Sequence, residues 1–194
     1  MPVSVSVSRA CGGGVHEVEV KFRILDEPAL LAALEARGVH LNEPVRQDDQ
    51  AYAPEGWSFG HGKLDVPFVR LRTVGGRHYF TLKRPTVNAQ SCLEYEAEVA
   101  DREQMHHAIL NMGFWPTVRM TKTRRSAVVA EFFLCVDELD GVGTFVELER
   151  MLPADQSAED MQAELAAFVT DLGVAAERTD ETYDSLVRAA LVAG

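Results

Sequence analysis

Glu17-Val-Glu19-Val-Lys21 is the stretch on which the fold prediction depends, because it reverses the usual pattern of a half-buried strand. Successive side chains of a strand point to opposite faces, so the two carboxylates and the ammonium share one face and the valines share the other. In an ordinary antiparallel sheet the apolar face packs on the core and the polar face meets water. Taken alone, this stretch is typical of a solvated strand face.

Charge pairs at the same two-residue spacing recur in three further segments with an extended pattern: Arg70-Leu-Arg72, Lys122-Thr-Arg124 and Glu147-Leu-Glu149. This recurrence favours one shared charged surface over four unrelated exposed edges. Acidic and basic pairs that face one cavity would hold divalent cations and a polyanion together.

The Glu-x-Glu pattern itself appears three times, at 17–19, 94–96 and 147–149, and each copy is followed by a capped helix and a glycine. The repetition predicts equivalent strands of one antiparallel sheet. If the charged faces point inward, the apolar faces need a cover, which amphipathic helices supply. We therefore predict an α+β fold, a closed or nearly closed antiparallel β-barrel (a tunnel) with a charged lumen and helices packed outside. The outward apolar positions are Val18, Val20, Phe22, Val69, Leu71, Phe80, Leu82, Tyr95 and Leu148.

Local signals place the elements along the chain. Asp26, Asp101 and Ser157 are predicted helix caps. The predicted strands span about 16–24, 45–53, 68–74, 77–84, 92–99, 117–129, 131–137 and 145–150, and the predicted helices span 28–37, 103–111, 158–172 and 180–192. The glycine-rich loop 54–67 is long enough to be a lid. Residues 1–14 are predicted to form a flexible N-terminal extension, and residues 15–194 a single domain.

Composition excludes several classes of partner. The formal net charge of −11 argues against binding to nucleic acid or to an anionic membrane surface. The three cysteines lack the spacing of a disulfide framework or a zinc site. No targeting or membrane-spanning run is found. Together these observations indicate a cytoplasmic protein. A homodimer is compatible with the sequence.

The charged residues suggest a chemistry. Arginine meets phosphate oxygens in pairs, and Lys21, Arg70, Arg72, Lys83, Lys122 and Arg124 form a set suited to a phosphate chain. Carboxylates would repel the same ligand unless a hard cation lay between them. Glu17, Glu19, Glu147 and Glu149 are therefore best explained as ligands of Mg²⁺ or Mn²⁺.

These motifs resemble the CYTH superfamily, the triphosphate tunnel metalloenzymes, over about 15–190. The resemblance rests on Glu17-x-Glu19-x-Lys21, Arg70-x-Arg72, the Lys83 strand, Glu94-x-Glu96, Lys122-x-Arg124, and Asp137 leading through Gly143 to Glu147-x-Glu149. The stretch Gln47-Asp-Asp49 and the ending Glu177-Arg-Thr-Asp-Glu-Thr-Tyr183 look most like the class IV adenylyl cyclase-like branch. One departure is Cys92, which stands where an arginine is common.

The resemblance implies roles for individual residues. Triphosphate would be bound by Lys21, Arg70, Arg72, Lys83, Lys122 and Arg124, and the metals by Glu17, Glu19, Asp137, Glu147 and Glu149. The catalytic set would be Glu17, Glu19, Lys21, Glu147 and Glu149. Glu96 is a weaker metal candidate, and Asp137 could instead belong to an acidic turn.

Three activities remain open at this point. The resemblance implies a metal-dependent enzyme of the adenylyl cyclase type, which converts ATP to cyclic AMP and pyrophosphate. The first alternative is a triphosphatase that hydrolyses thiamine triphosphate, inorganic triphosphate or a nucleoside triphosphate. The second is a non-catalytic module that binds polyphosphate, although the retained glutamates argue against a pure binder.

Overall fold

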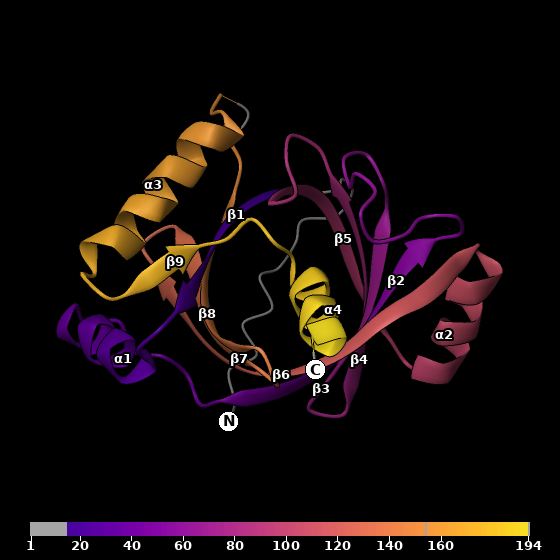
Figure 1. The fold of residues 1–194 in the computed structure, drawn as a ribbon, viewed down its shortest axis with the longest axis horizontal. Coiled ribbons are helices and arrows are strands. Elements are labelled where there is room, and N and C mark those ends of the chain that lie inside the picture. Colours follow the sequence, from indigo (N-terminus) through magenta and orange to yellow (C-terminus); the bar gives the residue numbers. More distant parts are fainter. Residues whose placement is uncertain (1–14, 154, 194) are drawn as a thin grey trace.

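The computed structural model describes residues 15–153 and 155–193, so the predicted 1–14 extension lies outside the described residues (Figure 1). The strands are β1 (Val15–Ile24), β2 (Val45–Pro54), β3 (Phe68–Val74), β4 (Arg77–Pro85), β5 (Ser91–Val99), β6 (Phe114–Val129), β7 (Phe132–Leu139), β8 (Gly143–Met151) and β9 (Ala176–Arg178). The helices are α1 (Glu27–Ala36), α2 (Arg102–Asn111), α3 (Ala158–Asp171) and α4 (Tyr183–Ala193).

The sheet closes on itself. Its order is β5-β4-β3-β2-β6-β7-β8-β1-β9, and an additional pairing of β5 with β1 joins the ends of the first eight strands into an antiparallel barrel. The three Glu-x-Glu strands are neighbours, because β1 pairs with β8 on one edge and with β5 on the other. The predicted barrel and the shared sheet are confirmed.

One edge of β1 changes neighbour along its length. Val15–Val18 pairs with β5, and Phe22–Ile24 pairs with the short strand β9. β9 is not predictable from its sequence, because three residues are too few to show alternation. The chain after β9 then crosses toward the lumen, so the last helix begins at Tyr183 and not at 180.

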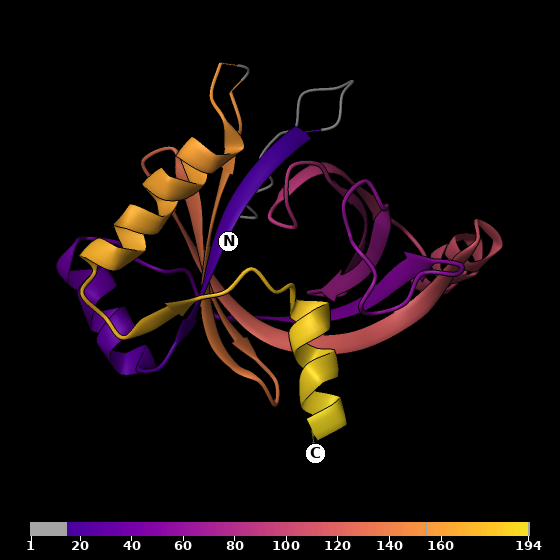
Figure 2. The same ribbon diagram turned by 45° about the horizontal axis from the view of Figure 1, so that its top comes forward.

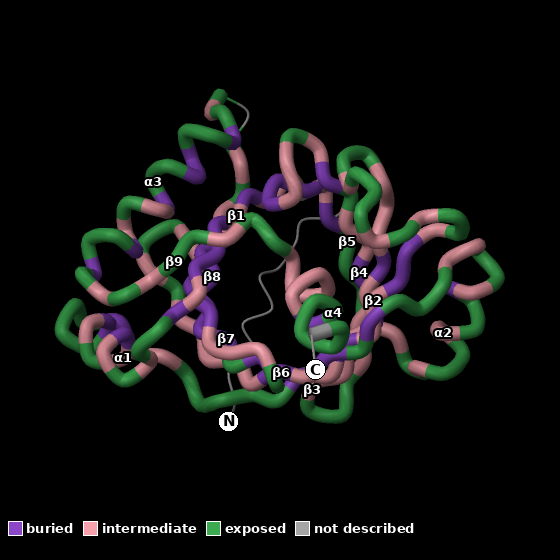
Figure 3. Tube along the Cα trace, viewed as in Figure 1, coloured by how far each residue is buried: buried purple, intermediate pink, exposed green. Residues whose placement is uncertain are grey.

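Three helices cover the outside of the barrel, as predicted. α1 and α3 lie against the β1 side, where Val18, Val20 and Leu148 form a core with Leu30 and Met161 (Figure 1). α2 covers the opposite side, where its Ile109 packs with β2 and β3. Figure 3 shows buried residues along the strands of the ring and exposed residues on the outer faces of these helices. Tyr95 differs from the predicted covered position, since it is 49% exposed.

α4 does not share this position. Its Val187 packs with Val118, Met120 and Phe145. Val118, Met120 and Lys122 are spaced two residues apart along β6, so their side chains share the inner face of the sheet. The helix α4 therefore lies on this inner face, at one end of the barrel (Figures 1 and 2). The expectation that all helices pack outside is therefore wrong for α4, because an apolar helix face packs equally well on either side of a sheet. Among the described helices, none is long and apolar enough to cross a membrane.

Candidate functional site

Each of the six predicted phosphate-binding cations pairs with an acidic side chain. Alternation places them on the inner faces of β1, β3, β4 and β6. The pairs are Lys21–Glu147 at 3.2 Å, Arg70–Glu96 at 3.5 Å, Arg72–Asp49 at 2.7 Å, Lys83–Glu94 at 2.7 Å, Lys122–Asp137 at 2.8 Å and Arg124–Glu147 at 2.6 Å. The lumen is therefore a mixed surface, in which each cation is held by a carboxylate.

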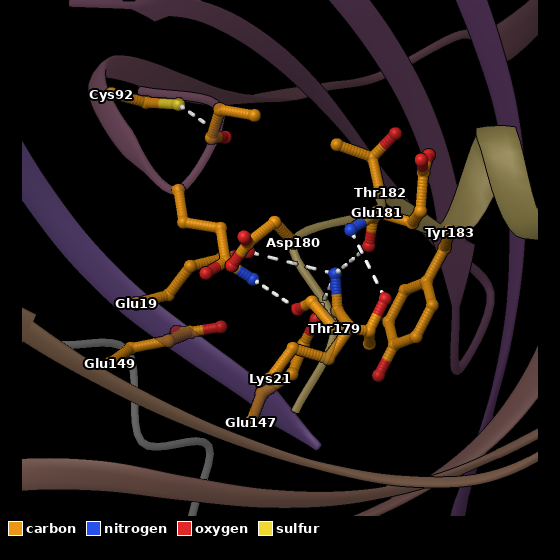
Figure 4. Close-up of polar contacts among 12 residues, drawn as sticks. Glu19, Lys21, Cys92, Glu147, Glu149, Thr179, Asp180, Glu181, Thr182 and Tyr183 are labelled. Carbon is orange, nitrogen blue, oxygen red and sulfur yellow. Dashed lines mark hydrogen bonds and ion pairs between the residues drawn. The ribbon is translucent and has the colours of Figure 1, made fainter. Parts of the chain in front are cut away.

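Glu17, Glu19 and Glu149 form an acidic cluster, defined by carboxylate oxygens that all lie within 4.8 Å of one another. The strands β1 and β8 create it, because Glu19 and Glu149 are directly opposite in the register. Figure 4 shows the Glu19 and Glu149 side chains extending toward the same space. Burial, together with the charge of Glu17, raises the pKa of Glu149 to about 8.

The acidic cluster suits a divalent metal ion. Its donors are carboxylate oxygens, which Mg²⁺ and Mn²⁺ prefer. The raised pKa of Glu149 shows that negative charge there is incompletely balanced by the protein, and a cation would balance it.

Glu147 lies in a different environment although it is two residues from Glu149. It accepts contacts from Lys21 at 3.2 Å and from Arg124 at 2.6 Å. Burial alone would raise the pKa of Glu147, but Lys21, Lys122 and Arg124 lower it below the ordinary value. Glu147 thus orders the basic residues in this structure.

Asp137 also lies among the basic residues. It is fully buried and accepts hydrogen bonds from Lys122 Nζ at 2.8 Å, Arg124 Nε at 2.6 Å and the Tyr183 hydroxyl at 2.9 Å. Burial would raise its pKa, but Arg124 and Lys122 hold it far below the ordinary range. Within the described chain, the acidic cluster includes neither Asp137 nor Glu147, so their metal roles stay predictions.

Sequence reasoning missed two residues of the lumen. Asp49 of β2 is 3% exposed and accepts two hydrogen bonds from Arg72, at 2.8 and 2.7 Å. The alternation of Gln47 and Asp49 is the signal that places Asp49 on the charged face of its strand. Tyr183 ends the 177–183 motif, but no local signal indicates that it lies in the lumen, because its position depends on where the chain re-enters the barrel.

The loop 54–67 is joined to the start of α4. Lys63 Nζ donates to the hydroxyls of Thr182 and Ser185, the second at 3.0 Å. Trp57 packs edge-on against Phe68, with ring centroids 5.0 Å apart. This loop therefore packs against the start of α4.

Comparison with known proteins agrees with this arrangement. A model of the CYTH domain matches residues 15–183. The adenylate cyclase CyaB of Aeromonas hydrophila is 26% identical over 181 residues, which cover 92% of each chain.

Two solved structures share the fold. A Vibrio parahaemolyticus protein with a provisional adenylate cyclase name superposes with a TM-score of 0.74 and 21% identity, over 90% of this chain and 99% of that one. A Hippeastrum protein, first named as an adenylyl cyclase and described as having a dominant triphosphatase activity, superposes with a TM-score of 0.59 and 18% identity, over 89% and 95%.

Proposed function

Because this chain belongs to the CYTH domain family, we propose that it is a divalent-metal-dependent enzyme that converts ATP to cyclic AMP and pyrophosphate inside the barrel. Named members of the family are adenylate cyclases or triphosphatases. The nucleotide preference and the cyclase reaction rest on the named relative that covers 92% of this chain.

One observation supports this proposal above the others: a three-carboxylate cluster adjoins a basic network in one lumen. A polyanion held by the cations alone would be repelled by the neighbouring glutamates. A hard cation between them removes that conflict, so metal and triphosphate are expected to bind together.

The acidic cluster and the basic side chains would have different roles. Glu17, Glu19 and Glu149 would hold Mg²⁺ or Mn²⁺, which supplies charge neutralisation and activation of an oxygen nucleophile. The triphosphate would exchange with the carboxylates that now occupy the basic side chains. Asp49, already bonded twice to Arg72, keeps that guanidinium oriented toward the lumen.

The second candidate is a triphosphatase. It is favoured by the activity described for the Hippeastrum relative, and the same lumen charges serve either reaction. Attack of the ribose 3′-oxygen on the α-phosphorus gives cyclic AMP, whereas attack of water at the terminal phosphorus gives orthophosphate.

One assay separates the candidates. The protein is incubated with ATP, thiamine triphosphate or tripolyphosphate and with Mg²⁺ or Mn²⁺, and the products are identified. Cyclic AMP with pyrophosphate supports the cyclase, orthophosphate supports the triphosphatase, and binding without turnover refutes both.

Two variants test the site itself. Glu147→Ala should abolish turnover, because it releases both Lys21 and Arg124. Glu98→Ala is the matched control, since Glu98 is a half-exposed glutamate that pairs with Arg77 on β4. Retained activity in Glu147→Ala would contradict the role proposed for Glu147 in the site.

A further inference from the structure

The segment 179–183 enters the lumen beside the short stretch of β1 between its pairings with β5 and β9. The Thr179 backbone N–H donates to the Lys21 carbonyl at 3.0 Å, and the Gln90 side chain donates to the Thr179 carbonyl at 3.0 Å. The Lys21 ammonium donates to the Glu181 carbonyl at 3.1 Å. The chain is therefore fixed on both sides before it reaches Tyr183.

The Tyr183 ring lies beside the ammonium groups of two predicted phosphate-binding lysines. Lys21 Nζ is 4.3 Å and Lys122 Nζ is 4.6 Å from the ring centroid. These lysines belong to β1 and β6, which are separated by β7 and β8 in the sheet. The ring thus joins two parts of the wall that have no direct strand pairing. Figure 4 shows it where α4 begins, beside Lys21.

The ring is itself held in place. Its hydroxyl donates to Asp137 Oδ2 at 2.9 Å, the carboxylate oxygen that Lys122 also contacts. Phe145 packs edge-on against it, with centroids 5.5 Å apart. Lys63 anchors the neighbouring turn through Thr182. A side chain with this many contacts can fix the position of the groups that pack on its face.

A neutral ring suits these two lysines better than another carboxylate would. Lys21 and Lys122 are each 2% exposed, so their charged forms need compensation for lost hydration. The face of an aromatic ring attracts ammonium groups without adding a net negative charge that would repel phosphate.

We propose that Tyr183 is a positioning residue, whose ring face holds the Lys21 and Lys122 ammonium groups in place to receive neighbouring phosphates of the triphosphate. This inference rests on the proposed function, because it assumes that the two lysines bind the triphosphate. It assigns no role to Tyr183 in the chemical step.

The test compares Tyr183→Phe, Tyr183→Leu and Tyr183→Met with the wild type. Dissociation constants for tripolyphosphate are measured by calorimetry in the presence of Mg²⁺, and kcat and KM are measured with the substrate that is turned over. Leu191→Ala is the control, because Leu191 lies on the same helix and is 72% exposed. Thermal unfolding of each variant identifies those that remain folded, and the Met variant serves if the Leu variant does not fold.

Loss of two contacts between a ring face and an ammonium group should weaken tripolyphosphate binding and raise KM by about tenfold or more in the Leu and Met variants. The Phe variant keeps the ring and should bind within about twofold of the wild type, and kcat should change less than KM in all three. A purely structural role would appear as a lower melting temperature of the Leu and Met variants, whereas loss of lysine positioning raises KM in variants that remain folded.

Several outcomes would overturn the inference. Unchanged or tighter binding in the Leu and Met variants would show that the ring does not position the lysines. A Phe variant as weak as the Leu variant would assign the effect to the hydroxyl. If the wild type itself failed to bind tripolyphosphate, the proposed function would fall, and this result is distinct from the first two.

Discussion

Replacement of Asp137 by asparagine would test how the lumen balances its charge. Asp137 is fully buried and accepts hydrogen bonds from Lys122, Arg124 and Tyr183. Asparagine keeps the shape of the side chain but removes its charge. Lys122 and Arg124 would then repel each other with one fewer carboxylate nearby.

The magnitude follows from the contacts. Loss of one partner from a buried ion pair costs about 3–5 kcal/mol. Glu147 still contacts Arg124 in the variant, so we expect the lower end, about 3 kcal/mol. For a chain of this size, that loss lowers the melting temperature by roughly 6–12 °C.

Urea unfolding followed by circular dichroism measures the loss. Tripolyphosphate supplies negative charge to the same cations, so it should stabilise Asp137→Asn more than the wild type. Asp140→Asn is the matched control, because Asp140 lies in the following turn, is 44% exposed and pairs with Arg46 at the surface. Its cost should stay within about 1 kcal/mol.

Two results would refute this reasoning. A loss no larger than that of the control would mean that Asp137 does not balance the basic residues. Alternatively, the Asp137→Asn variant could have normal stability without metal but no longer be stabilised by Mg²⁺. That result would support the metal role that the family resemblance implies for Asp137.

Two further predictions concern the edges of the network. Asp49→Asn should raise KM for the triphosphate by about tenfold with a smaller change in kcat, because Arg72 loses a charged partner bonded at two points, and steady-state kinetics measures both constants. The pKa of Glu149 is raised from 4.5 to about 8, so the folded protein keeps a proton that the unfolded chain releases. Stability of the metal-free protein should therefore fall as the pH rises from 4.5 to 8, and Mn²⁺ affinity should increase about tenfold per pH unit below 8. Thermal unfolding and metal titration across this pH range check both trends, and Glu149→Gln should remove them.

The barrel could be predicted because charged residues spaced two apart in a strand must point to the same face. Glu17, Glu19 and Lys21 must share one face of an extended strand, and the valines between them must share the other. Helix starts were equally local, and the side chains of Asp26, Asp101 and Ser157 each accept a backbone N–H of the first turn. Features specified by neighbouring residues were thus accessible from the sequence.

Features that depend on the closed barrel were not accessible. α4 packs on the inner face, and its apolar residues show the same period as those of an outer helix. Tyr183 reaches the lumen because the preceding residues cross β1 between its pairings with β5 and β9. The different environments of Glu147 and Glu149 depend on strand register, which the chain does not reveal locally.

That register explains why acid and base can share one lumen. In the β1–β8 ladder Lys21 lies opposite Glu147, which is a pair of opposite charges. Two residues further along, Glu19 lies opposite Glu149, which is a pair of like charges. Opposite charges across a ladder stabilise it and like charges destabilise it. A register shifted by two residues would place Lys21 opposite Glu149 and remove the repulsion, yet the structure retains the like pair. Binding of a divalent cation to Glu19 and Glu149 would offset this cost, so metal binding should stabilise the fold at the same residues that the proposed reaction requires.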